Sequence, residues 1–235
     1  MKQQILSLLR KIRATIVLVI KPKRNYFLFA VPTRSLEPIS HKYGFDRGTP
    51  VDRYYIEQFL QEHQGDIAGH CLEVTDPTYT KRFGAGRVTQ SDVVDINVKN
   101  EMATIIADLR DARDIGDNTY DCVIATHTFG VIDEYQKAIA ECYRILKPGG
   151  VLLSTVASLG VAAELNLSYW RFTTTSARYA FGKIFSPDHV VVQSYGNVLS
   201  GQAYWVGLST QELTEEELAH NDPRYSIVVG IRAVK

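Results

Sequence analysis

The chain has 235 residues, of which 45% are apolar and 22% charged, the balance of an ordinary globular protein rather than a disordered or fibrous one. The three cysteines, Cys71, Cys122 and Cys142, are scattered and form no CxxC pair. Neither a zinc site nor a disulfide framework is therefore indicated, and no metal is expected. The apolar stretch Ala14–Ile20 is far shorter than the roughly 20 residues of a membrane span.

The formal charge is zero but unevenly distributed. Residues 1–24 contain seven Lys and Arg side chains and no acid, whereas the rest of the chain contains 19 basic and 26 acidic side chains. Apolar residues of this segment recur at helical spacing, namely Ile5, Leu8, Leu9, Ile12, Ile16, Val19 and Ile20. Residues 1–40 therefore form a basic amphipathic arm. Binding to an anionic membrane surface, binding to a partner protein and packing on its own domain stay open as roles for residues 1–24.

The remaining residues, 41–235, form the second predicted domain. Their net charge of −7 argues against nucleic-acid binding. The scattered cysteines favour a reducing compartment, so we expect a cytoplasmic protein. If the arm binds lipid, the protein would lie on the inner face of the membrane.

From residue 51 onward the pattern is that of an α/β domain. Short apolar runs alternate with helical patterns, which predicts a mostly parallel sheet with helices on both faces. The predicted strands are His70–Val74, Arg87–Val93, Ala103–Ala107, Tyr120–Ala125 and Val151–Val156, and the predicted helices are Val51–His63 and Tyr135–Leu146. Ligands bind such sheets beyond the carboxyl ends of the strands, so the functional residues should follow these runs.

The C-terminal part has a different pattern, with more strands than helices. The predicted strands are Val190–Gln193, Gln202–Gly207 and Ser226–Val234, with a helix over Glu212–His220. The run Tyr225–Ile231 is expected to pair antiparallel at the edge of the sheet. The fold class is therefore a Rossmann-like α/β domain with an antiparallel C-terminal edge strand.

The order of these elements resembles the class I S-adenosylmethionine-dependent methyltransferases. Tyr143–Leu153 is similar to the helix, turn and fifth strand of that family, and Tyr120–Ala125 is similar to its fourth strand. The resemblance covers residues 43–235. Gly44–Tyr55 and Tyr169–Thr173 resemble a subgroup found beside glycosyltransferases in cell-surface polysaccharide pathways. The resemblance implies S-adenosylmethionine as cofactor and a small-molecule or glycan hydroxyl as methyl acceptor.

The resemblance also implies which residues hold the cofactor. Glu73 and Val74 end the first strand and Thr75 follows it, where the family has an acid and then a glycine-rich turn. Asp92 is similar to the acid that holds the ribose hydroxyls, and Asp108 and Leu109 to the turn that contacts adenine. Thr75 and Pro77 stand where the family has glycines, and this departure keeps two alternatives open. One is a non-catalytic binding module, and the other is an enzyme that uses this fold for different chemistry.

The acceptor side is predicted from residues around the expected sheet edge. His127 follows the fourth strand and is a candidate general base, and Asp46 is a second candidate catalytic residue. Arg47, Arg53, Trp170 and Arg171 are candidate substrate-binding residues. A surface ion-pair network and core packing are the alternative explanations for these charged and aromatic side chains.

Overall fold

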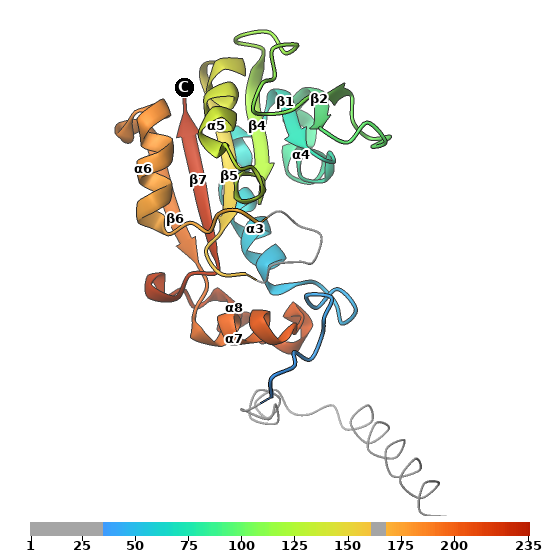
Figure 1. The fold of residues 1–235 in the computed structure, drawn as a ribbon, viewed down its shortest axis with the longest axis vertical. Helices are drawn as coiled ribbons and strands as arrows, with labels where there is room; N and C mark the ends of the chain where they lie inside the picture. The colour runs from blue at the N-terminus through green and yellow to red at the C-terminus, as the bar shows by residue number, and fades with distance from the viewer. Residues whose placement is uncertain (1–34, 161–167) are drawn as a thin grey trace, which may run out of the picture.

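The computed structural model describes residues 35–160 and 168–235. The amphipathic helix predicted within residues 1–24 lies outside the described residues. Within the described residues, one sheet of seven strands forms the centre of the domain, in the order β3-β2-β1-β4-β5-β7-β6 (Figure 1). The strands are β1 (Gly69–Val74), β2 (Val88–Asp95), β3 (Ile105–Ile106), β4 (Tyr120–Thr126), β5 (Leu146–Ala157), β6 (Val190–Tyr195) and β7 (Val228–Val234).

The sheet is parallel from β3 to β5 and antiparallel in its C-terminal part. β7 pairs antiparallel with β5, and β6 pairs antiparallel with β7. The predicted α/β fold with an antiparallel C-terminal strand is therefore confirmed. The prediction placed β7 at the edge of the sheet. In the structure β6 pairs along the outer side of β7, so β6 is the edge strand.

Helices cover both faces of the sheet (Figure 1). The α-helices are α3 (Val51–Glu62), α4 (Thr78–Gly84), α5 (Tyr135–Ile145), α6 (Thr174–Phe185), α7 (Val198–Val206) and α8 (Glu215–Ala219). Alternate residues of β4 point to opposite faces, as expected of a strand buried on both sides. Val123 packs in the core beneath α5 and α6, whereas Ile124 packs in the core beneath α3, α4 and α7.

Six short 3-10 turns join these elements within the described part of the chain. They are η1 (Gln64–Asp66), η2 (Ala85–Arg87), η3 (Phe129–Val131), η4 (Pro187–His189), η5 (Thr210–Glu212) and η6 (Pro223–Tyr225). No helix of the described residues is both long and apolar enough to cross a membrane.

The C-terminal region contains two departures from the sequence prediction. The strand predicted over Gln202–Gly207 is wrong, because these residues belong mostly to α7. Asn197 and Ser200 form a capping box at its start, and Gly207 with φ +74° ends it, so local capping overrides the strand preference of the aromatic residues. The helix α6 was not predicted, although Ala177, Phe181 and Phe185 give it a buried stripe at helical spacing.

The bounds of β2 and β3 also differ from those predicted. β2 runs to Asp95, two residues beyond the predicted end at Val93, and β3 is reduced to Ile105–Ile106. The pairing of Val94 and Asp95 with β3 extends β2, so its end depends on a strand that lies later in the chain. This change decides which acid lies at the carboxyl end of the sheet.

Candidate functional site

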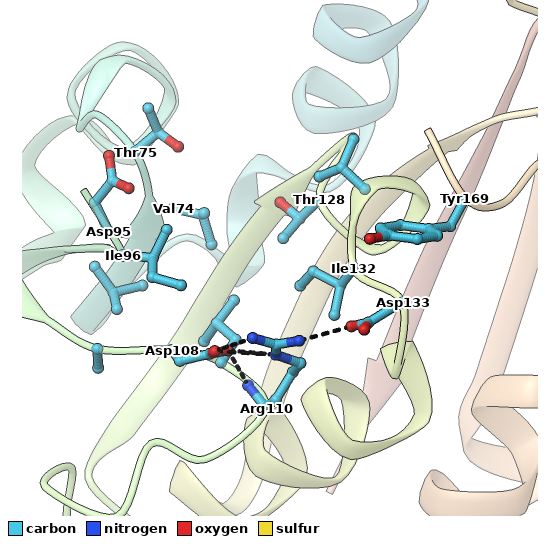
Figure 2. A pocket seen from close by; sticks show the side chains of 14 residues that line it. Val74, Thr75, Asp95, Ile96, Asp108, Arg110, Thr128, Ile132, Asp133 and Tyr169 are labelled. Carbon is cyan, nitrogen blue, oxygen red and sulfur yellow. Dashed lines mark hydrogen bonds and ion pairs between the residues drawn. The ribbon is translucent and has the colours of Figure 1, made fainter. Parts of the chain in front are cut away.

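A cavity of about 400 Å³ lies at the carboxyl ends of β1, β2 and β4 (Figure 2). Its walls are mainly apolar, with acids and one arginine at separate positions, which is the usual composition of a small-molecule site. The lining residues are Val74, Thr75, Val94, Asp95, Ile96, Ala107, Asp108, Leu109, Arg110, Thr128, Val131, Ile132, Asp133 and Tyr169. We call this space the main cavity.

Thr75 begins the turn after β1 and adopts a backbone conformation that favours glycine. Its φ of +78° lies in the left-handed region, where a β-branched residue is a genuine outlier. The turn is fixed by two hydrogen bonds: Thr75 N donates to Val94 O at 2.9 Å, and Asn100 Nδ2 donates to Thr75 O at 2.6 Å. The local geometry therefore suits a glycine even though the sequence has a threonine.

Glu73 joins β1 to α4 from a buried position. Its carboxylate is 3% exposed and accepts hydrogen bonds from Tyr79 N at 3.0 Å and Thr80 N at 2.7 Å. Burial raises the pKa of Glu73, and these hydrogen bonds only partly oppose that effect. Asp76 accepts from Thr78 N at 3.0 Å, so the first amides of α4 are already engaged within the chain.

Asp95, rather than Asp92, is the acid of β2 that lines the main cavity. Asp92 lies three residues before the end of the strand, where its Oδ2 is 2.7 Å from His70 Nε2. Tyr120 donates to the same oxygen at 3.2 Å. Asp95 ends the strand, and Asn100 Nδ2 donates to its Oδ2 at 2.7 Å. The sequence prediction ended the strand at Val93 and therefore did not place Asp95 at its end.

Asp108 and Leu109 both line the main cavity, as their position after β3 predicts. Arg110 lies between two acids there, donating to Asp108 Oδ2 at 2.6 Å and to Asp133 Oδ1 at 2.8 Å (Figure 2). Hydrogen bonding from Arg110 lowers the pKa of Asp108. Sequence reasoning missed Arg110 and Asp133. Arg110 could have been predicted as a cavity residue because it lies two residues after Asp108. Asp133 could not, because it is distant from both residues in the chain.

His127 follows β4 and lies close to the first turn of α3. Its Nδ1 is 3.7 Å from Asp52 Oδ2, while its Nε2 is buried with no hydrogen-bond partner among the described residues. Burial lowers the pKa of His127, and the charge of Asp52 partly opposes this effect. The imidazole is therefore held in its neutral form at neutral pH.

A second cavity of about 490 Å³ adjoins the turn after β1. Arg53, Glu73, Val74 and Thr75 line it, and Val74 and Thr75 also line the main cavity. Arg53 Nη1 donates to Tyr79 Oη at 3.1 Å. The further lining residues are Phe45, Gly48, Thr49, Pro50, Glu57, Asp76, Thr78, Tyr79 and Thr126.

Asp46 and Arg47 line neither cavity. Asp46 accepts a hydrogen bond from Ser40 Oγ, which lowers the pKa of the Asp46 carboxyl. Arg47 forms a two-point ion pair with Glu212, with Nε 2.9 Å from Oε2. Asp46 therefore makes a contact within the loop before α3, and Arg47 connects that loop to η5. The pairing of Arg47 agrees with the alternative explanation that these charges form a surface ion-pair network.

The segment of Trp170 and Arg171 runs beside the main cavity. Trp170 Nε1 donates to the carbonyl oxygens of Ile132 and Asp133, both at 3.0 Å, and its ring packs edge-on against Tyr135 at 5.3 Å. The neighbouring Tyr169 lines the cavity itself (Figure 2). Arg171 Nη1 donates to Trp170 O at 3.1 Å.

The main cavity suits a nucleoside-containing ligand such as S-adenosylmethionine. Apolar side chains from Ile96, Leu109 and Ile132 can contact a flat base, and the carboxylates of Asp95 and Asp108 can accept from hydroxyl or amino groups. At the start of α4, the amides of Tyr79 and Thr80 already donate to Glu73, so fewer backbone donors are left for a ligand near the turn after β1. Within residues 35–160 and 168–235, no cluster of three or more His, Cys, Asp or Glu side chains is placed to hold a metal ion.

The strand order, with its antiparallel C-terminal pair and a cavity at the carboxyl ends, is that of the class I methyltransferase fold. A S-adenosylmethionine-dependent methyltransferase from Archaeoglobus fulgidus superposes with a TM-score of 0.55 at 12% identity, covering 83% of this chain and all of that one. The [4+2]-cyclase SpnF superposes with a TM-score of 0.50 at 13% identity, covering 77% of this chain and 80% of that one. At these identities the similarity shows the fold alone.

Residues 74–154 match the family model described as a methyltransferase domain. The match runs from the end of β1 into β5 and includes most residues that line the main cavity. A search of curated proteins finds no match. Residues 74–154 are therefore similar to a methyltransferase domain, and the chain as a whole has the fold of the superposed structures.

Proposed function

We propose that the protein transfers a methyl group from S-adenosylmethionine to a hydroxyl of a small molecule or glycan. The observation that carries the proposal is the main cavity, where Asp95 and Asp108 follow neighbouring strands among apolar side chains. The methyltransferase match of residues 74–154 supports the cofactor class. The resemblance of Gly44–Tyr55 and Tyr169–Thr173 to glycan-pathway proteins supports the acceptor class.

In this proposal the residues that would hold the cofactor are those at the ends of β1 to β4 that line the main cavity. Val74 and Thr75 would border it, Asp95 would accept from ribose hydroxyls, and Asp108 would accept from the adenine amino group. Leu109 would pack on the base. When bound, S-adenosylmethionine supplies a methyl group on a cationic sulfur, whose bonding electron pair stays on sulfur as the methyl group leaves. The protein contributes alignment of the reacting groups.

The acceptor lies on the side of α3 and His127. His127 Nε2 takes the proton of the acceptor hydroxyl in this proposal, since a neutral imidazole with its proton on Nδ1 has a lone pair on Nε2. Arg53 lines the adjoining cavity and can hold a polar group of the acceptor. Tyr169 and Trp170 supply aromatic side chains, whose faces suit sugar rings, and Arg171 adds a cation near His127.

A second candidate is a non-catalytic module or an enzyme with different chemistry on the same fold. The specific observation in its favour is the turn after β1, which lacks glycine and whose following helix has its first amides engaged by Glu73 and Asp76. The similarity to a [4+2]-cyclase shows that this fold also occurs in a protein with another named activity.

Calorimetry of the full-length chain with S-adenosylmethionine and with its demethylated product tests the proposal. We expect measurable binding of both. Asp108→Ala should weaken it by about 1–3 kcal/mol, the cost of an unpaired polar partner. No heat and no thermal shift at millimolar cofactor would favour the non-catalytic module.

We also propose that residues 1–24 attach the protein to an anionic membrane surface, which would place it at the inner face of the cell membrane. Seven cations and an apolar stripe at helical spacing support this role. The first described residue is Ser35. The segment that follows it contacts α7, because Ile39 N donates to Val206 O at 2.8 Å.

A further inference from the structure

Asp52 and His127 come from separate elements and meet beneath the start of α3. Asp52 lies in the first turn of α3, and His127 follows the last residue of β4. Asp52 Oδ2 is 3.7 Å from His127 Nδ1, and the two side chains are 14% and 24% exposed. This separation is slightly longer than a hydrogen bond, and it can shorten when a ligand closes the site.

The backbone holds His127 in a fixed and unusual position. Its φ of +50° lies in the left-handed region, which only a few per cent of non-glycine residues adopt. His127 N donates to Thr155 O at 2.7 Å, so the turn is tied to β5. Strained residues of this kind cluster at functional sites, and here the strain places the imidazole against Asp52.

The second ring nitrogen of His127 has no partner to satisfy it. Nε2 is buried and makes no hydrogen bond within the described part of the chain. Buried polar atoms are almost always hydrogen-bonded, so an exception calls for an explanation such as a ligand. The two nitrogens therefore differ: Nδ1 has an acidic neighbour, and Nε2 has no polar partner among the described residues.

We propose that Asp52 is a positioning residue that holds the proton on Nδ1 of His127 and leaves the Nε2 lone pair facing the acceptor. The proposal rests on the methyl-transfer function proposed above and names the residue that orients its base. A base is needed when the acceptor oxygen carries a proton, so the arrangement fits the hydroxyl acceptor of that function rather than a carboxylate. The oxygen–hydrogen bond breaks, the proton moves to Nε2, and the electron pair stays on the oxygen.

The charges around the pair are consistent with this role. Arg53 from α3 and Arg171 from the segment before α6 act on His127 as nearby cations that favour its neutral form. Tyr204 of α7 faces the same group of charges, and burial raises the pKa of its hydroxyl to about 12, so it stays protonated. Asp52 supplies the negative charge that stabilises the imidazolium formed when Nε2 takes a proton.

Nitrogen NMR of the full-length chain labelled at histidine tests the inference without any acceptor. The chain has six histidines, and comparison with His127→Gln assigns the signal of His127. We expect a neutral ring at pH 7 with its proton on Nδ1. In Asp52→Ala this preference should be lost, and the pKa of His127 should fall because the stabilising charge is gone.

Asp52→Asn serves as a second variant, because it keeps a side-chain oxygen for the hydrogen bond from Arg53 N while removing the charge. It too should lower the pKa of His127. The matched control is Asp111→Asn, which removes a carboxylate paired with Arg113 on another part of the surface, and should leave the His127 signal unchanged.

A proton on Nε2 in the wild type, or an unchanged His127 in both Asp52 variants, would overturn the inference. Thermal-shift measurements with S-adenosylmethionine on the same samples separate the two proposals. If Asp52 controls the tautomer but no cofactor binds, the pairing is right and the methyl-transfer function is wrong.

Discussion

Arg110 and Asp108 form a close ion pair inside the main cavity, with Nη2 2.6 Å and Nε 2.9 Å from Asp108 Oδ2. The same guanidinium reaches Asp133 across the cavity. A carboxylate that is proposed to accept from the adenine amino group is therefore already engaged. A ligand that uses Asp108 has to compete with Arg110 or displace it.

The first prediction follows from this competition. Arg110→Gln should tighten S-adenosylmethionine binding by at most roughly fivefold, because a solvent-exposed ion pair contributes little free energy. Isothermal calorimetry measures the change. Arg113→Gln is the matched control, since Arg113 pairs with Asp111 two residues earlier in the same way but outside the cavity. Weaker binding in Arg110→Gln would show that Arg110 itself contacts the ligand.

The second prediction concerns the turn after β1. Thr75→Gly should raise the free energy of unfolding by up to about 1 kcal/mol, because relief of left-handed strain exceeds the entropy lost on folding a glycine. Urea unfolding measures the change. Thr78→Gly is the control, since Thr78 starts α4 and a glycine there should destabilise. Equal destabilisation in both variants would mean that Thr75 is not strained.

The third prediction separates the two acids of β2. Asp95→Ala should weaken cofactor binding by about 1–3 kcal/mol, because Asp95 lines the main cavity and Asp92 does not. Asp92→Asn should instead lower the free energy of unfolding by about 1–3 kcal/mol through the loss of the carboxylate that contacts His70. Paired calorimetry and urea unfolding on both variants decide the assignment. The opposite pattern would restore Asp92 as the ribose-binding acid.

The fourth prediction is a pH dependence that originates at Glu73. Its pKa is raised by burial, so the native state holds this proton more tightly than the unfolded chain does. Ionising Glu73 therefore lowers stability as the pH rises above about 4.3, the ordinary value for glutamate. Glu73→Gln cannot ionise, so its stability relative to the wild type should increase from pH 4.5 to pH 7. Urea unfolding across this range measures the difference, and a constant difference would contradict the prediction.

The fifth prediction concerns residues 1–24. A variant that begins at Ser35 keeps the contact of Ile39 with α7 and should stay folded, while losing binding to vesicles that contain an anionic lipid. Each cation near such a surface contributes about 1 kcal/mol at low salt. Co-sedimentation with anionic and neutral vesicles measures the effect. If the full-length chain ignores anionic vesicles in low salt, the membrane role is wrong, and if truncation unfolds the domain, the arm belongs to the core.

The sequence by itself determined the order of the strands from β1 to β5 and the helix α5 between β4 and β5, but not α4. Apolar runs such as Tyr120–Ala125 predict buried strands because the signal lies within each run. The end of α5 followed by Gly149 and Gly150 predicts the reversal into the buried part of β5, and Gly149 adopts a φ of +80° as such a turn requires. These features depend on neighbours in the sequence.

Only the tertiary structure decided which side chains meet at the site. Asp95 ends β2 because the strand pairs with β3, and Asp133 reaches Arg110 because η3 brings it to the cavity. Asp52 meets His127 because α3 packs over the carboxyl end of β4. In each case the two partners lie far apart in the chain, so their distance is set by packing of the whole sheet and its helices, which no local pattern of residues encodes.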